Sequence, residues 1–181
     1  MLIYCDLDEV IADFTGAALE VHGWDRDRLH KNRLLGHWNM ATAMGLTDEE
    51  FWTPLDKAGV EFWVDIHPLP WAGRVLRLLA THEWYIVTSP SASLTSYAGK
   101  LQWLLDHVGR VDNCIITRHK HLLAKEGAVL IDDRESNLHK FEESGGSGIL
   151  FPSEGNSLHD QAKDPIPELT RKLEGYDALN F

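Results

Sequence analysis

Two carboxylates, Asp6 and Asp8, follow the first apolar segment of the chain and are separated by a single residue. Residues 2–5 are a short apolar run, which is typical of a strand buried on both faces. Residues two apart in an extended segment point to the same side, and neighbouring like charges make each other harder to ionise. A divalent cation or a shared catalytic task would remove that cost. An acidic turn after a strand is the alternative, and the pair alone does not decide between them.

A second acidic pair, Asp132 and Asp133, follows another apolar run at residues 128–131. Parallel strands that both end in carboxylates would bring these acids and the first pair to one edge of a sheet. Mg²⁺ is a hard cation that prefers oxygen ligands, so it would stabilise such a cluster. The second pair could instead cap the helix that follows it.

Groups suited to phosphate lie between the two acidic pairs. Thr88 and Ser89 end a third apolar run, and Lys100 lies in the helix predicted after it. Hydroxyl groups can bind phosphate oxygens, and a lysine ammonium acts on phosphate as a point charge. A helix cap and a solvated lysine are the ordinary explanations of these residues. A single site explains better why all of these groups occur in this order.

This ordered set resembles the haloacid dehalogenase superfamily of Mg²⁺-dependent phosphotransferases over nearly the whole chain. Its four motifs are matched by Asp6 to Val10, Thr88, Lys100, and Asp132-Asp133. Further segments resemble the 5′(3′)-deoxyribonucleotidase family: Asp8 to Phe14, Thr88 to Pro90, Lys100 to Trp103, Thr117 to Lys120, and Ile131 to Arg134. Glu61 to Val64 is similar to the cap segment that lines the nucleoside pocket of that family. Family members often have Asp where this chain has His119.

The resemblance implies hydrolysis of (deoxy)ribonucleoside 5′-monophosphates through an aspartyl-phosphate intermediate. Asp6 would be the nucleophile, and Asp8 would act first as an acid and then as a base. Mg²⁺ would be held by the Asp6 side chain, the Asp8 backbone carbonyl and Asp133, with Asp132 as the alternative to Asp133. The preferred base and sugar, and the choice between 5′ and 3′ phosphates, are left open.

The resemblance also implies substrate contacts outside the acidic pairs. Thr88, Ser89 and Lys100 would hold phosphate oxygens. Candidates for further contacts with phosphate, sugar or base are Arg118, Lys120, Arg134, Phe14, Phe62, Trp63 and Val64. Surface cations and ordinary packing between cap and core are the alternative explanations of these residues.

Two other functions compete with the nucleotidase. A phosphatase acting on a sugar phosphate or another small phosphomonoester would use the same chemistry, although the aromatic residues favour a nucleotide. A non-catalytic binding domain of the same fold is a different class, and the intact Asp6, Asp8, Lys100 and Asp133 argue against it.

The elements that must position these residues alternate from residue 70 onward. Apolar runs predict strands over 2–5, 84–88, 113–116, 128–131 and 148–151, and helical spacing predicts helices over 71–81, 96–107, 136–143 and 167–174. This alternation predicts an α/β fold with a doubly wound, mainly parallel, five-stranded sheet.

Residues 15–69 lack this alternation and contain helical segments at 17–21 and 47–58, the second beginning with the N-cap Thr47. We expect a small helical cap inserted after the first strand, and a core made of residues 1–14 and 70–181. The cap would lie over the carboxyl edge of the sheet, where ligands bind in open α/β folds.

Composition limits the partners of the protein. The 181 residues carry 28 Asp and Glu against 17 Lys and Arg, a net charge of −11 that disfavours binding to a nucleic-acid polymer. No long apolar stretch or secretory leader is present, so we expect a cytoplasmic protein without membrane contact. Cys5 and Cys114 are expected to be reduced thiols within strands. The expected partner is a small phosphorylated substrate, and a homodimer is left open.

Overall fold

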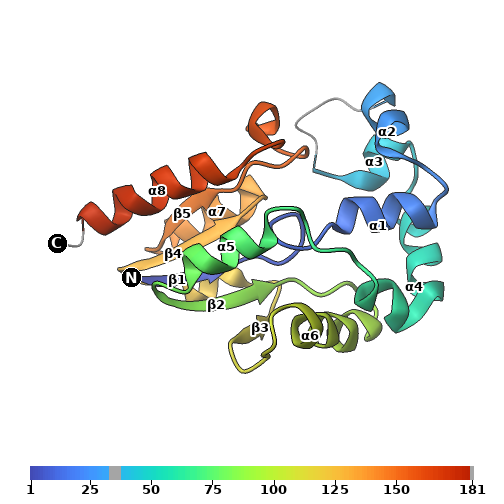
Figure 1. Ribbon diagram of the computed structural model, residues 1–181. Helices are drawn as coiled ribbons and strands as arrows, with labels where there is room; N and C mark the ends of the chain where they lie inside the picture. The colour runs from blue at the N-terminus through green and yellow to red at the C-terminus, as the bar shows by residue number, and fades with distance from the viewer. Residues whose placement is uncertain (33–37, 180–181) are drawn as a thin grey trace.

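The computed structural model describes residues 1–32 and 38–179 and shows a parallel sheet with helices on both faces (Figure 1). The described sheet has the strand order β3-β2-β1-β4-β5, and every neighbouring pair is parallel. Its strands are β1 (Leu2–Cys5), β2 (Glu83–Thr88), β3 (Cys114–Ile116), β4 (Ala128–Asp132) and β5 (Ser147–Leu150). The predicted doubly wound α/β sheet is therefore confirmed.

The register of the central strands brings the predicted site residues to one edge. Cys5 pairs with Ile86 of β2 on one side and with Ile131 of β4 on the other. The backbone N–H of Asp6 continues this ladder by donating to the carbonyl oxygen of Ile131 at 2.8 Å. Asp6 and Asp132 therefore leave the sheet side by side, and Thr88 ends the strand on the other side of β1.

Helices cover both faces of the sheet and bury the two faces of β1 in separate cores. Ile3 and Cys5 lie in the core formed with α5 (Ala72–Leu79), α6 (Thr95–His107) and α8 (Ile166–Leu179). Tyr4 faces the other core, formed with α7 (Glu135–Glu143) and the 3-10 turn η1 (Lys120–Leu123). A second 3-10 turn, η2 (His159–Gln161), precedes α8. Among the described residues, no helix is both long and apolar enough to span a membrane.

Four further helices lie beyond the carboxyl ends of the strands, at the right of Figure 1. They are α1 (Phe14–Val21), α2 (Arg26–Asn32), α3 (Met40–Met44) and α4 (Asp48–Val64). Residues 33–37 of the predicted cap lie outside the described residues. The position of these helices over the strand ends is what a cap requires, and we propose that they form one.

Helix α4 begins as predicted but extends further than predicted. The side chain of Thr47 accepts from the Glu50 backbone N–H at 3.2 Å, and the Glu50 carboxylate accepts from the Thr47 N–H at 2.9 Å, which completes a capping box. The chain leaves helical geometry at Gly59 (φ 75°, ψ −143°) and then resumes it up to Val64. The predicted segment 47–58 ended at this break, because nothing in the pattern showed that a second helical piece follows it.

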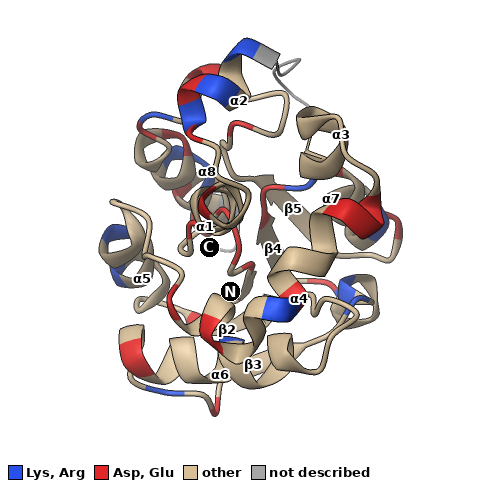
Figure 2. Cartoon of the chain, turned by 90° about the vertical axis from the view of Figure 1, so that its right-hand side faces the viewer, with Lys and Arg blue, Asp and Glu red and all other residues tan. Residues whose placement is uncertain are grey.

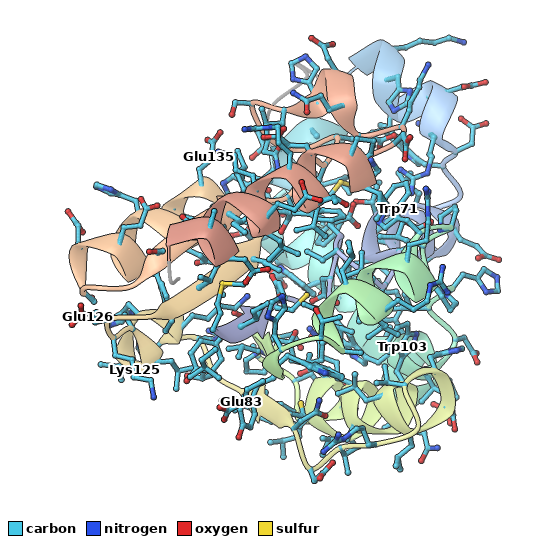
Figure 3. All side chains as sticks on the ribbon, turned by 60° about the vertical axis from the view of Figure 1, so that its left-hand side comes forward. Trp71, Glu83, Trp103, Lys125, Glu126 and Glu135 are labelled. Atoms are coloured by element: carbon cyan, nitrogen blue, oxygen red, sulfur yellow. The ribbon has the colours of Figure 1, made fainter. Side chains whose placement is uncertain are left out.

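The indole N–H groups of Trp71 and Trp103, both labelled in Figure 3, hold the segments that connect the cap helices to the sheet. Trp71 donates to the carbonyl oxygen of Val10 at 3.0 Å, and Trp103 donates to that of Ile66 at 2.7 Å. Val10 lies on the segment that enters the cap helices and Ile66 on the segment that leaves them. Both connections are therefore held to the core by a hydrogen bond.

Both cysteines are free thiols located in strands, as predicted. Burial raises the pKa of Cys114 to about 11 and raises that of Cys5 further. Both side chains are therefore protonated and unreactive at neutral pH.

Candidate active site

Asp6 is buried at the end of β1, and its two carboxylate oxygens have different partners. Oδ1 accepts from the backbone N–H of Leu7 at 2.8 Å, whereas Oδ2 lies 2.8 Å from Nζ of Lys120. These contacts fix the carboxylate beside the strand end.

Lys120 connects the first acidic pair to the second. Its Nζ lies 2.8 Å from Asp6 Oδ2 and 2.6 Å from Asp132 Oδ2, and only 2% of its side chain is exposed. Burial alone would lower the pKa of Lys120, but Asp132 and Asp6 outweigh it and raise the pKa. The alternative explanation of Lys120 as a surface cation is therefore excluded. The side chain is a charged bridge between two carboxylates.

The two acids at the end of β4 are held very differently. Asp132 is fully buried, and its oxygens accept from Asn137 Nδ2 at 3.1 Å and from the Arg134 N–H at 2.9 Å in addition to Lys120. Asp133 accepts from Ser153 Oγ at 3.3 Å. The lone pairs of Asp132 are largely used by protein donors, so Asp133 is better placed to bind a metal ion.

The carboxylates of Asp6, Asp132 and Asp133 form a cluster that suits a cation. One oxygen from each lies within 4.8 Å of the others. Burial raises the pKa of Asp132 to about 6 against the effect of Lys120. Burial, Asp132 and Asp6 together raise the pKa of Asp133 well above its ordinary value. The single positive charge of Lys120 does not balance three carboxylates, and a hard divalent cation such as Mg²⁺ fits this excess of oxygen ligands.

Asp8 pairs with the second buried lysine of the site, Lys100. Lys100 Nζ lies 2.5 Å from Asp8 Oδ2, 2.8 Å from Thr88 Oγ1 and 2.9 Å from the Ser89 carbonyl oxygen. Burial raises the pKa of Asp8 despite this ammonium group. The other carboxyl oxygen, Oδ1, is buried and has no partner among the described residues. A carboxyl group with a raised pKa and a free oxygen is suited to proton transfer.

The remaining polar candidates lie around this centre. Thr88 is fully buried, and Ser89 Oγ donates to the carbonyl oxygen of Thr117 at 3.3 Å. Arg118 is exposed, and its Nε donates to the carbonyl oxygen of Pro90 at 3.2 Å. Both Ser89 and Arg118 are thus placed at the ends of β2 and β3, where the sequence predicted them.

Arg134 contacts a cap residue that the sequence analysis did not select. Its Cζ lies 3.6 Å from the ring centroid of Trp38, and its Nε is buried without a partner among the described residues. Trp38 precedes α3 in a segment that matches none of the motifs, so only its residue type could have drawn attention to it.

The predicted aromatic residues meet in one cluster at the base of the cap helices. The Phe14 ring stacks on Trp63 with centroids 5.8 Å apart and meets Phe62 edge-on at 5.9 Å. Phe51 and Trp52 complete the cluster around Phe14, and Val64 follows Trp63 at the end of α4. Phe62 and Trp63 are buried and Phe14 is half-buried, so these residues pack against one another.

A cavity of about 600 Å³ lies between α2 and the loop after β5. Arg26, Trp71 and Glu154 contribute to its walls, and Glu9 and Ser153 link it to the acidic cluster. The aromatic residues predicted to contact substrate do not line this cavity.

Comparison with known proteins identifies relatives of the chain. A family model described as "5′ nucleotidase, deoxy (pyrimidine), cytosolic type C protein" matches residues 1–163. No curated protein matches. A haloacid dehalogenase-like hydrolase of Streptococcus pneumoniae superposes with a TM-score of 0.56 at 15% identity, covering 94% of this chain and 97% of that one.

Two further solved structures share the fold and contain ions. A hydrolase of the same superfamily from Deinococcus radiodurans, with bound phosphate and sodium, has a TM-score of 0.54 at 14% identity and covers 90% and 86% of the two chains. One from Bacillus subtilis, bound to magnesium, has a TM-score of 0.50 at 16% identity and covers 81% and 84%. At these identities the likeness concerns the fold.

Proposed function

This chain belongs to the cytosolic type C 5′-nucleotidase family of haloacid dehalogenase-type hydrolases, and we propose that it hydrolyses deoxyribonucleoside 5′-monophosphates in a Mg²⁺-dependent reaction. The observation that carries the proposal is the arrangement of four acids around two buried lysines. Lys120 holds Asp6 and Asp132, Lys100 holds Asp8, and Asp133 adds a further carboxylate beside Asp6.

In the first step, a carboxylate oxygen of Asp6 forms a bond to phosphorus while the bond from phosphorus to the nucleoside oxygen breaks. Asp8 gives its proton to that oxygen, which leaves as the nucleoside hydroxyl. Asp6 then carries the phosphoryl group as an acyl phosphate. The raised pKa of Asp8 supports this role, because the group must be protonated when the reaction begins.

In the second step, Asp8 is a carboxylate and takes a proton from water. The water oxygen attacks phosphorus, the bond from phosphorus to Asp6 breaks, and inorganic phosphate leaves. Asp8 ends the cycle protonated again. One carboxyl group serves both steps because the proton that it loses in the first step is regained in the second.

Charge compensation is the task of the groups around these two acids. Lys120 holds the Asp6 carboxylate in position, while Thr88 and Ser89, at the end of β2, would hold phosphate oxygens. Asp6, the Asp8 carbonyl and Asp133 would hold Mg²⁺, which would reduce the repulsion between the anionic nucleophile and the anionic phosphate.

Recognition of the nucleoside is assigned to the cap side of the site. Phe14 is half-buried at the edge of the aromatic cluster, with Phe62 and Trp63 behind it. An aromatic face can stack on a base and exclude water. We propose Arg118 and Arg134 as the cations that contact phosphate or sugar. The description of the matching family, which names deoxy and pyrimidine nucleotides, agrees with this assignment.

The test is phosphate release by the wild-type protein across deoxynucleotides, ribonucleotides, 3′-nucleotides and sugar phosphates, with Mg²⁺ or with EDTA. We expect metal-dependent turnover that is highest on deoxyribonucleoside 5′-monophosphates. Turnover confined to sugar phosphates would support the phosphatase mechanism and would reject a nucleotide as the substrate. Absence of phosphate release from every substrate would favour a non-catalytic binding domain.

The Asp6→Asn variant tests the nucleophile. It should lose turnover entirely while its urea unfolding curve shows a folded protein. Activity near that of the wild type would reject Asp6 as the nucleophile.

A further inference from the structure

The ammonium group of Lys100 has three hydrogen-bond acceptors and one aromatic ring as neighbours. A lysine ammonium has three N–H bonds, and three oxygen acceptors lie within 2.9 Å of Nζ, on Asp8, Thr88 and Ser89. The indole ring of Trp63 has its centroid 5.1 Å from the same nitrogen. This distance lies within the range of a cation–π interaction, which is strongest with tryptophan and with desolvated cations.

We propose that Trp63 is a positioning residue that holds the Lys100 ammonium against Asp8, and thereby fixes the carboxyl group that protonates the leaving group. This inference rests on the proposed function, because it assigns Asp8 the role of acid. It gives Trp63 a task in the first chemical step that is separate from any contact with the nucleoside.

The position of Trp63 depends on a close approach between α4 and α6. A Cβ atom on Gly99 would lie 2.3 Å from Cβ of Trp63 and 3.0 Å from the carbonyl oxygen of Val60. The last turn of α4 can therefore reach α6 only because residue 99 has no side chain. Since Gly99 directly precedes Lys100, this contact sets Trp63 beside the lysine.

Packing alone holds the indole in place. Trp63 is 2% exposed and stacks on Phe14, and its Nε1 has no hydrogen-bond partner among the described residues. The face of the ring lies toward the Lys100 ammonium. No hydrogen bond of the indole N–H to another described residue orients the ring. Movement of α4 relative to α6 would shift the ring away from the Lys100 ammonium.

The role of Asp8 as an acid can be isolated by the choice of leaving group. A benzyl alkoxide is strongly basic and needs a proton to leave, whereas p-nitrophenolate leaves readily without one. Benzyl phosphate and p-nitrophenyl phosphate have similar size and aromatic character, so loss of aromatic packing affects their binding alike. The ratio of their kcat/KM values (benzyl over p-nitrophenyl) therefore reports the acid.

The experiment measures this ratio for the wild type, Trp63→Phe and Trp63→Met. Methionine fills the space without a π face, so we expect its ratio to fall about tenfold, while phenylalanine keeps a weaker face and gives an intermediate ratio. Trp52→Met is the matched control, because Trp52 lies on α4 before the Gly59 break and also contacts Phe14. Its ratio should equal that of the wild type.

A Trp63→Met variant that lowers both kcat/KM values equally would overturn the inference, as would a changed ratio in Trp52→Met. If Trp63→Met does not fold, a Trp63→Phe ratio at or above the wild-type value would also overturn the inference. This measurement does not use a nucleotide. An error in the proposed nucleotide substrate would therefore appear in the wild-type substrate panel and not in the ratio. A wild type that releases phosphate from neither p-nitrophenyl phosphate, benzyl phosphate nor any substrate of the panel would overturn the inference together with the phosphatase chemistry.

Discussion

At the scale of single residues, the site divides its positive charge between two lysines that serve different acids. Lys120 contacts Asp6 and Asp132, whereas Lys100 contacts Asp8. In the proposed reaction the nucleophile must stay ionised and the acid must be protonated at the start. Lys120 contacts two carboxylates, so it fixes the direction of the Asp6 carboxylate and offsets part of the negative charge of the pair.

Lys120→Met should weaken both folding and catalysis. It leaves two buried carboxylates without their cation, so the free energy of unfolding in EDTA should fall by about 3–5 kcal/mol. Loss of the group that orients the nucleophile should lower kcat about a hundredfold in Mg²⁺. Urea denaturation and steady-state kinetics measure the two effects. Lys125→Met is the control, because Lys125 is exposed, away from the site (Figure 3), and should change stability by less than about 0.5 kcal/mol.

An unchanged kcat in Lys120→Met would show that the contact with Asp6 serves folding alone. A drop in kcat without loss of stability would show instead that the two carboxylates find other compensation in the absence of lysine.

At the scale of elements, the break in α4 has a physical cause that a substitution can test. Gly59 has φ 75° and ψ −143°, a conformation open to glycine and strained for other residues. Gly59→Ala should lower the free energy of unfolding by about 1–3 kcal/mol. Gly175 lies inside α8 with open space around it, so Gly175→Ala should raise stability by about 0.5–1 kcal/mol. Urea denaturation measures the free energy of unfolding of both variants. If the two substitutions changed it in the same direction, the need for glycine at the break in α4 would be contradicted.

The strands and the acids at their ends were predictable because each follows from a local pattern. An apolar run predicts β4 over 128–131, and the strand ends one residue later at Asp132. Parallel strands end at a common edge, so the meeting of Asp6 with Asp132 follows from the fold class.

The partners of these acids were not predictable, because they depend on how distant elements pack. Lys120 was assigned a substrate contact, and its position on the turn η1 between Asp6 and Asp132 was not foreseen. The contact of Trp63 with Lys100 requires the approach of α4 to α6 at Gly99. Neither arrangement leaves a periodic signal in the sequence.

At the scale of the whole molecule, negative charge is in excess overall and is also concentrated in the site. In Figure 2 the Lys and Arg segments are interspersed with acidic segments along the part of the chain that the structure describes. The raised pKa values of Asp132 and Asp133 show that ionising these carboxyl groups opposes folding when no cation is bound. The metal-free protein is therefore destabilised by its own site.

The repulsion between the carboxylates of the site should appear as a lower Tm in EDTA than in Mg²⁺. A ligand at 100 times its Kd stabilises by about 2.7 kcal/mol, which corresponds to a Tm increase of about 5–10 °C for a chain of this size. Asp133→Asn removes one of the mutually repelling charges, so its Tm in EDTA should exceed that of the wild type while its response to Mg²⁺ is lost. Asp160→Asn, at an exposed carboxylate, should behave as wild type in both conditions. An Asp133→Asn protein that still gains stability with Mg²⁺ would place the metal on other ligands, because the removed carboxylate would then contribute nothing to binding.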